Sequence, residues 1–93
     1  MRFRAEVEVF LKPGLLDPQG KAVEGSLPAL GWTNVRNVRI GKAVELELEA
    51  ADRSSATSQV QEIAERLLSN PVIERFEVRD VIELVGGNGE VRA

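Results

Sequence analysis

Alternation of apolar and polar residues from Arg2 to Lys12, interrupted only by Phe10, is the feature that most limits what this chain can form. The residues of one parity are all apolar: Phe3, Ala5, Val7, Val9 and Leu11. Successive side chains on a strand point to opposite faces, so a period of two over this length predicts a strand with one buried and one solvated face. Pro13-Gly14 then predicts the end of the strand.

Asp17-Pro18 is typical of a helix start. An aspartate side chain can accept hydrogen bonds from the free backbone N–H groups, and proline suits the first helical position. Val23, Leu27 and Leu30 follow at i, i+4 and i+7, which predicts one apolar helix face. Pro28 falls late in the segment, and Gly31 marks its end.

A hairpin is predicted next, with a short strand from Val35 to Ile40, a tight turn at Gly41-Lys42, and a second strand from Val44 to Glu49. The second strand alternates again. Every second residue is apolar, and the residues between them, which point to the opposite face, are all glutamates: Glu45, Glu47 and Glu49.

A second helix and a final strand complete the pattern. Asp52, Ser54 and Ser55 are each able to cap the helix, and the pattern does not choose among them. The predicted apolar stripe of the helix consists of five residues: Val60, Ile63, Ala64, Leu67 and Leu68. Asn70-Pro71 ends the helix, and the last strand is expected from Ile73 to Val85.

The predicted order is strand, helix, strand, strand, helix, strand. This order indicates an α+β, ferredoxin-like βαββαβ fold, in which a four-stranded antiparallel sheet carries two helices on one face. A chain of 93 residues suits a single domain. We expect that domain to span residues 1–85, followed by a flexible Gly-rich C-terminal tail over residues 86–93.

The last predicted strand is unusually long. Thirteen residues extend to about 43 Å, against about 20 Å for the strand from Val35 to Ile40, so the last strand should overhang its neighbours. Its overhanging end would carry four apolar residues: Val81, Ile82, Leu84 and Val85. A bare apolar edge promotes aggregation, so these four residues are predicted to form an oligomer interface, in a dimer or a tetramer.

Composition excludes several classes of function. The chain has no cysteine and no histidine, which removes disulfide scaffolds, thiolate nucleophiles, serine–histidine pairs and the usual zinc sites. The net charge of −3 does not favour nucleic acid or an anionic membrane surface as a partner. No apolar run approaches the about 18 residues of a membrane span, and no signal-peptide pattern is visible, so a soluble cytoplasmic protein is expected.

The glutamates of the two alternating strands are the main candidates for chemistry. Convergent carboxylates could serve a glycosidase or a metal site, but a solvated or partner-facing sheet surface is the favoured interpretation. Three arginines could form cross-strand ion pairs with them: Arg36, Arg39 and Arg79. An RNA recognition motif is disfavoured, because Phe10 is the one aromatic residue on the polar strand face and the glutamates would repel phosphate.

Gly41-Lys42 is similar to the end of a phosphate-binding loop. That motif requires glycine where this chain has Arg36, and serine or threonine where it has Ala43. A hairpin turn is therefore the favoured interpretation of this dipeptide.

Four segments in register resemble landmarks of the PurS family. They are Asp17-Pro18-Gln19-Gly20, Val38-Arg39-Ile40-Gly41-Lys42, Glu45-Leu46 and Leu67-Leu68-Ser69-Asn70-Pro71-Val72-Ile73-Glu74. The resemblance covers Phe3 to Val85. It singles out seven motif positions as possible partner contacts: Asp17, Gln19, Gly20, Arg39, Gly41, Lys42 and Asn70.

The resemblance implies a non-catalytic subunit of phosphoribosylformylglycinamidine synthase, an ATP-dependent, glutamine-hydrolysing carbon–nitrogen ligase complex of de novo purine (IMP) biosynthesis. Such a subunit would join a glutaminase to a large synthetase, so that glutamine-derived ammonia reaches formylglycinamide ribonucleotide. No cofactor is expected in this chain; ATP and magnesium would be bound by the synthetase. A free-standing dimeric module that senses a small molecule shares this topology and stays open as an alternative.

Overall fold

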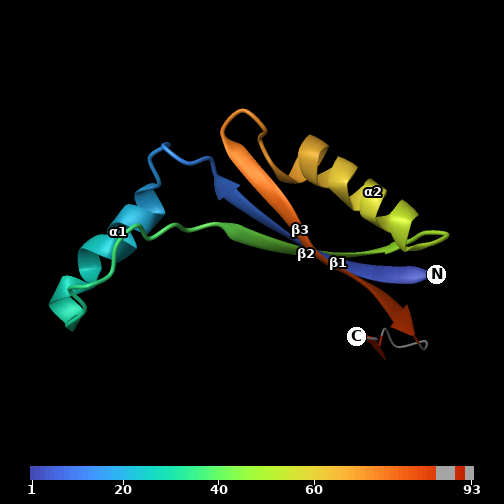
Figure 1. The fold of residues 1–93 in the computed structure, drawn as a ribbon, viewed down its shortest axis with the longest axis horizontal. Helices are drawn as coiled ribbons and strands as arrows, with labels where there is room; N and C mark the ends of the chain where they lie inside the picture. Colours follow the sequence, from blue (N-terminus) through green and yellow to red (C-terminus); the bar gives the residue numbers. More distant parts are fainter. Residues whose placement is uncertain (86–89, 92–93) are drawn as a thin grey trace.

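The structure is a computed structural model that describes residues 1–85 and 90–91. The elements in chain order are β1 (Arg2–Leu11), α1 (Pro18–Ser26), a 3-10 turn η1 (Pro28–Leu30), β2 (Lys42–Glu49), α2 (Arg53–Ile63), a π-helical turn η2 (Ala64–Leu68), β3 (Glu74–Val85) and β4 (Glu90–Val91). The strands form one antiparallel sheet in the order β2-β1-β3-β4. Figure 1 shows α2 over one face of the sheet and α1 beyond its end.

The alternation predicted for β1 is confirmed. Four of its apolar residues are at most 1% exposed: Phe3, Ala5, Val7 and Val9. Ala5 lies opposite Leu46 of β2 and Val81 of β3, and both of these pack against the buried cluster. The strand with the cleanest period of two is therefore the central strand, whose inner face forms the floor of the core.

A β-bulge interrupts the pairing of β1 with β3. Glu6 pairs with Asp80, and the next β1 residue, Val7, pairs with Val78, so that Arg79 is the extra residue. The extra residue changes the parity of β3 that faces the core. Val78 before the bulge and Val81 after it therefore both pack against the core cluster, although the two valines are three positions apart and would face opposite sides of a regular strand.

Asp52 is the residue that caps α2, because its Oδ1 atom accepts a hydrogen bond from the backbone N–H of Ser55 at 2.8 Å. Ala56, Val60 and Ala64 follow at intervals of four and are completely buried. The helix lies over β3 and β1. Burial of this narrow stripe of residues is what attaches α2 to the sheet.

The predicted stripe is wrong at Leu67, which is 79% exposed. The backbone N–H of Ser69 bonds to the carbonyl of Ala64 at 2.9 Å, an i→i+5 bond that marks a π-helical turn. Such a turn holds one residue more than an α-helical turn, so the residues that follow are rotated back about the helix axis. Leu68 thereby reaches the core, and Leu67 leaves it.

The predicted strand from Val35 to Ile40 is not formed, so the prediction of a hairpin is wrong. The segment has no ladder partner among the described residues. Side chains accept its backbone donors instead: the N–H of Val38 bonds to Glu24 at 3.1 Å, and that of Ile40 bonds to Asp17 at 2.8 Å. The α+β class and the antiparallel sheet are confirmed, but three long strands and the two-residue β4 replace the predicted four.

Helix α1 does not cover the sheet, so the prediction of two helices on one sheet face is also wrong. Val23 and Leu30 of its apolar face are 42% and 68% exposed. The chain measures 50 × 30 × 15 Å with a radius of gyration of 17.1 Å. A compact chain of this length would have a radius of gyration of about 12 Å. Residues 13–41 project from the sheet, and we call them the arm (Figure 1).

The predicted overhang of the last strand is wrong as well. β3 pairs with β1 along almost its whole length, from Glu74 opposite Leu11 to Leu84 opposite Arg2. The strand is long because its antiparallel neighbour is nearly as long. β4 adds two backbone pairs, at Leu84 and Val85.

The predicted flexible tail lies largely outside the described residues, which include only Glu90 and Val91 of it. None of the helices in the described parts of the chain combines the length and the apolar character that a membrane crossing needs.

Candidate functional site

Four of the seven motif positions line one shallow hollow of about 600 Å³, at the end of the sheet where β1 ends and β2 begins. They are Asp17, Gln19, Gly41 and Lys42. Glu74, the first residue of β3, also lines this hollow, which we call the end hollow. The structure thus brings together residues from three separate segments of the sequence.

Asp17 connects α1 to the part of the arm that leads back to the sheet, residues 35–41, which we call the returning segment. Its Oδ1 accepts from the N–H of Gly20 at 2.9 Å, and its Oδ2 accepts from the N–H of Ile40 at 2.8 Å. The side chain is buried, with 5% of the residue exposed. These two hydrogen bonds, aided by the positive charge of Arg39, hold the pKa of the Asp17 carboxyl below its ordinary value.

Gly20 and Gly41 are sites of close backbone approach. A Cβ atom on Gly20 would overlap the carbonyl oxygen of Val38. A Cβ atom on Gly41 would lie 2.5 Å from the carbonyl oxygen of Val9 and also overlap the ring of Phe10. Both glycines therefore allow the returning segment to pass against α1 and β1.

Arg39 supplies a further connection within the arm. Its guanidinium donates to the backbone carbonyls of Leu15 at 3.1 Å, Leu11 at 3.2 Å and Lys12 at 3.3 Å. Asp17 and Glu24 also accept hydrogen bonds from the returning segment. Together, these contacts join the outgoing part of the arm (residues 13–26) to the returning segment, and both of them to the end of β1. We call Asp17, Gly20, Glu24, Arg39 and Ile40 the arm clamp.

Asn70 lies in the turn that leads into β3. Its Oδ1 accepts from the N–H of Val72 at 3.1 Å, and its own backbone N–H donates to Glu74 Oε1 at 2.7 Å. Because Glu74 also lines the end hollow, Asn70 is connected to that hollow through one residue. The four residues of the predicted oligomer interface, which follow Asp80, lie at the other end of β3. The structure therefore separates the predicted oligomer interface from the motif positions that line the end hollow.

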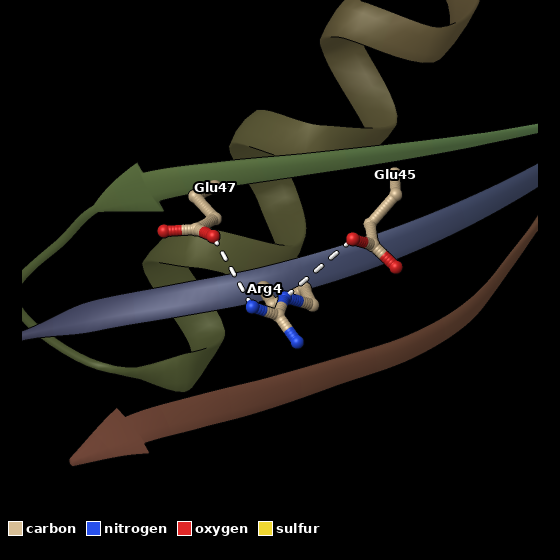
Figure 2. A network of polar contacts seen from close by, with 3 residues as sticks. All are labelled: Arg4, Glu45 and Glu47. Carbon is tan, nitrogen blue, oxygen red and sulfur yellow. Dashed lines mark hydrogen bonds and ion pairs between the residues drawn. The ribbon is translucent and has the colours of Figure 1, made fainter. Parts of the chain in front are cut away.

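The open face of the sheet carries arginines between its glutamates. Arg4 Nη2 lies 3.3 Å from Glu47 and Arg4 Nε lies 3.7 Å from Glu45, as Figure 2 shows. Arg79 lies 3.7 Å from Glu8 and 3.0 Å from Glu77. The predicted ion pairing is therefore correct for Arg79.

It is wrong for Arg36 and Arg39, which lie in the arm rather than on a strand. Within residues 1–85 and 90–91, no three acidic side chains are grouped so that they could hold a metal ion. The strand glutamates thus belong to a solvated, arginine-paired surface, which suits protein contact better than acid–base chemistry.

Sequence reasoning missed two residues of this region, Glu24 and Glu74. Glu24 lies seven residues after Asp17, a spacing that places both carboxylates on one face of a helix. That spacing was a usable signal, because two carboxylates on one side of a helix can accept from the backbone N–H groups of a neighbouring segment, as they do here from Val38 and Ile40. Glu74 ended a family motif but was not singled out as a site residue.

Known proteins resemble this chain over most of its length. The family described as "PurS: Phosphoribosylformylglycinamidine (FGAM) synthase" matches residues 4–81. The phosphoribosylformylglycinamidine synthase subunit PurS of Bacillus subtilis is 44% identical over 82 residues, which are 86% of this chain and 96% of the relative. The corresponding Synechocystis subunit is 43% identical over 74 residues, 80% of this chain and 74% of the relative. This chain belongs to the PurS family.

Solved PurS structures share the fold. Thermus thermophilus PurS superposes with a TM-score of 0.82 at 39% identity, covering 91% of this chain and 100% of the other. A chain of the PurLQS structure from Thermotoga maritima superposes with a TM-score of 0.78 at 34% identity, covering 85% of this chain and 96% of the other. Both superpositions extend over nearly the whole length of the solved PurS chains, and not over a fragment of them.

Proposed function

We propose that this chain is the PurS subunit of a phosphoribosylformylglycinamidine synthase and bridges two other subunits, a glutaminase and an ATP-dependent synthetase. In this role it would place the ammonia source next to the site that uses ammonia, so that glutamine-derived ammonia reaches formylglycinamide ribonucleotide. The observation that carries the proposal is the family match over residues 4–81. The presence of a PurS-like chain in the PurLQS structure supports assembly with further subunits.

The composition supports a bridging role rather than a catalytic one. A glutaminase that forms a thioester needs a cysteine nucleophile and a base, and this chain contains neither cysteine nor histidine. We therefore assign the phosphoryl chemistry, with ATP and magnesium, to the synthetase subunit, and no cofactor to this chain. A purine-biosynthetic complex of this kind would work in the cytoplasm.

The end hollow is the surface that we assign to a partner subunit. It combines the buried carboxylate of Asp17 with exposed polar side chains, Gln19 and Lys42, on a scaffold that the hydrogen bonds of the arm clamp hold in place. A rigid scaffold lowers the entropy lost on association, which is the physical advantage of the clamp for a subunit that works by contact.

A pull-down with purified glutaminase and synthetase subunits tests this proposal. We expect the tagged chain to retain both partners, and Lys42→Glu in the end hollow to weaken retention of one of them. Glu65→Lys reverses an exposed charge on η2, away from the hollow, and serves as the matched control. Retention of neither partner by the wild-type chain would contradict the bridging role and favour a free-standing sensing module.

We also infer that the chain self-associates through β3. The outer edge of β3 has no partner strand from Glu74 to Glu83 among the described residues, because β4 pairs only with Leu84 and Val85. An unpaired edge next to the half-buried Val81 and Ile82 invites a second chain. Ile82→Asp should lower the mass found by sedimentation, whereas deletion of residues 86–93 should not. An unchanged mass for Ile82→Asp would remove β3 from the interface.

A further inference from the structure

A second hollow lies on the other side of β1 from the end hollow, and its volume is about 430 Å³. Phe10 lines it from the open face of the sheet, whereas Val9 lines the end hollow from the core face, because neighbouring side chains of a strand point to opposite faces. The other side chains that line it are those of Leu11, Pro13, Asn37, Arg39 and Arg75. Two of these described lining residues are arginines and none is acidic, so we call this feature the arginine hollow.

Arg75 is exposed, but neighbouring residues fix its position. It pairs with Phe10 across β1 and β3, and its guanidinium lies over the Phe10 ring, 5.4 Å from the ring centre. The ring in turn packs against Gly41, where there is no room for a Cβ atom. A guanidinium stacked on a ring keeps its edge, which carries the N–H groups, open to an acceptor.

Arg39 reaches the arginine hollow from the returning segment. Three backbone carbonyls accept hydrogen bonds from its Nη1 and Nη2 atoms, which fixes the guanidinium. A guanidinium has more N–H groups than these three bonds use, so Arg39 keeps donors for an outside acceptor. Asn37, which lines the same hollow, has a φ of 58° and is the one residue other than glycine with a positive φ among the described residues. Backbone strain of this kind is concentrated at functional sites.

Neither arginine of the hollow forms an ion pair within the described parts of the chain. The next pair of residues along the open face, Glu8 and Glu77, lies 3.7 and 3.0 Å from Arg79 instead. The carboxylate of Asp17 is occupied by its two backbone donors. Two oriented positive charges thus lack a carboxylate, the group that a guanidinium binds with two parallel N–H bonds.

We propose that the arginine hollow receives an acidic segment of a partner subunit, the one that does not occupy the end hollow, and that Arg39 and Arg75 bind its carboxylates. The apolar lining favours a protein segment over a free anion, because it gives the residues around the carboxylates something to pack against, and arginine is enriched where proteins meet. A bridge needs two surfaces that can be occupied at once, and the two hollows lie on opposite sides of β1. This inference rests on the proposed bridging role and states the chemistry of one of its two contacts.

Zero-length cross-linking tests this contact directly. Arg75→Lys keeps the positive charge and supplies an amine, which a carbodiimide joins to a carboxylate that touches it. In a complex with purified glutaminase and synthetase subunits, mass spectrometry should find position 75 linked to an aspartate or glutamate of one partner subunit. Arg36→Lys is the matched control, because Arg36 is exposed and lines neither hollow, and it should give few such links. Links from position 75 only within this chain or to a second copy, or no links, would overturn the proposal.

Affinities measured for each partner separately show which of them uses the arginine hollow. Arg75→Glu should raise the Kd for one partner at least tenfold, and Lys42→Glu should raise the Kd for the other. Arg36→Glu changes the net charge by the same amount and should change either Kd less than twofold. An unchanged Kd for both partners in Arg75→Glu, or a loss of the same partner in Arg75→Glu and Lys42→Glu, would refute the assignment.

Arg75→Gln keeps the test decisive if Arg75→Glu does not fold, because it removes the charge without adding a carboxylate beside Glu77. It should weaken the same partner by a smaller factor. Charged contacts weaken as the ionic strength rises, so salt should raise the Kd of the wild-type chain for that partner more than the Kd of Arg75→Gln. An equal salt dependence would refute the contact. If the wild-type chain binds neither partner, the bridging role itself is wrong; if it binds both and the Arg75 variants bind both as tightly, the role of the arginine hollow alone is refuted.

Discussion

The carboxylate of Asp17 joins two segments that lie 23 residues apart, because its Oδ2 accepts from the backbone N–H of Ile40 at 2.8 Å while its Oδ1 caps α1 at Gly20. A single side chain therefore satisfies a helix terminus and an irregular segment at once. Backbone donors removed from water need such partners. The returning segment of the arm can consequently stay ordered without joining the sheet.

The closeness of α1 to the returning segment predicts opposite effects for two substitutions in the same helix. Gly20→Ala would push a methyl group into the carbonyl of Val38 and should lower the free energy of unfolding by about 1–3 kcal/mol. Gly25→Ala meets no atom within 4 Å and should raise it by about 0.5–1 kcal/mol through higher helix propensity. Chemical denaturation of both variants gives the comparison, and equal effects would mean that the clamp is not closed in solution.

The charge of Asp17 predicts a defined pH window for the clamp. Its folded-state pKa lies below the ordinary value of 3.8, so ionised Asp17 stabilises the fold above pH 3.8, and this contribution is lost as the pH falls through the lower folded-state pKa. The amide proton shift of Ile40 should thus stay constant from pH 7 to about pH 4 and move only below that.

Asp17→Asn provides the control for this titration. The N–H groups of Gly20 and Ile40 reach two different oxygens of Asp17, and asparagine has a donor NH2 group in place of one of them, so one of the two hydrogen bonds is lost. The Ile40 amide should already be displaced at pH 7 in this variant, with no further change between pH 7 and about pH 3 attributable to position 17. A titration of the wild-type Ile40 amide near pH 6 would contradict the assignment.

Two valines test which residues form the core. Val60 is fully buried, so Val60→Ala should lower the free energy of unfolding by about 2 kcal/mol through lost burial and a small cavity. Val72 is 78% exposed, and Val72→Ala should change it by less than about 0.5 kcal/mol. The chemical change is the same at both sites. A similar change in the free energy of unfolding for both variants would therefore mean that α2 does not bury Val60 against the sheet.

Local patterns predicted most of the elements of this fold. Alternation identified β1 and β2 because every second side chain of each strand lies on the core side of the sheet, and Asp17-Pro18 identified the start of α1 because capping needs only residues next to it. The family motifs also named residues that prove to be neighbours around the end hollow, although they come from separate segments.

The errors arose where distant contacts decide the structure. Val35 to Ile40 has strand-like residues, but carboxylates of α1 take the backbone donors that a ladder would need. Leu67 fits an α-helical stripe, and a single π-helical turn moves it off the core. No local pattern predicts that the arm leaves the sheet, because the apolar pattern of α1 is the same whether or not the helix packs on its own sheet.

The bridging role predicts an unequal dependence on the nitrogen source. Synthesis from glutamine should fall strongly when this chain is omitted from a mixture of glutaminase and synthetase, whereas synthesis from added ammonia should fall little. A bridge matters only where ammonia has to pass from one subunit to the other, and the proposal assigns the phosphoryl transfer itself to the synthetase.

Both assays can use one synthetase preparation, with and without the chain, at saturating ATP and magnesium. Lys42→Glu should restore less glutamine-dependent activity than the wild-type chain restores, and Glu65→Lys should restore it fully. Ammonia-dependent activity should differ little among the four mixtures, because the synthetase site is intact in each. Equal loss of both activities without the chain would show that it shapes the synthetase site itself, and the bridging role would then be wrong.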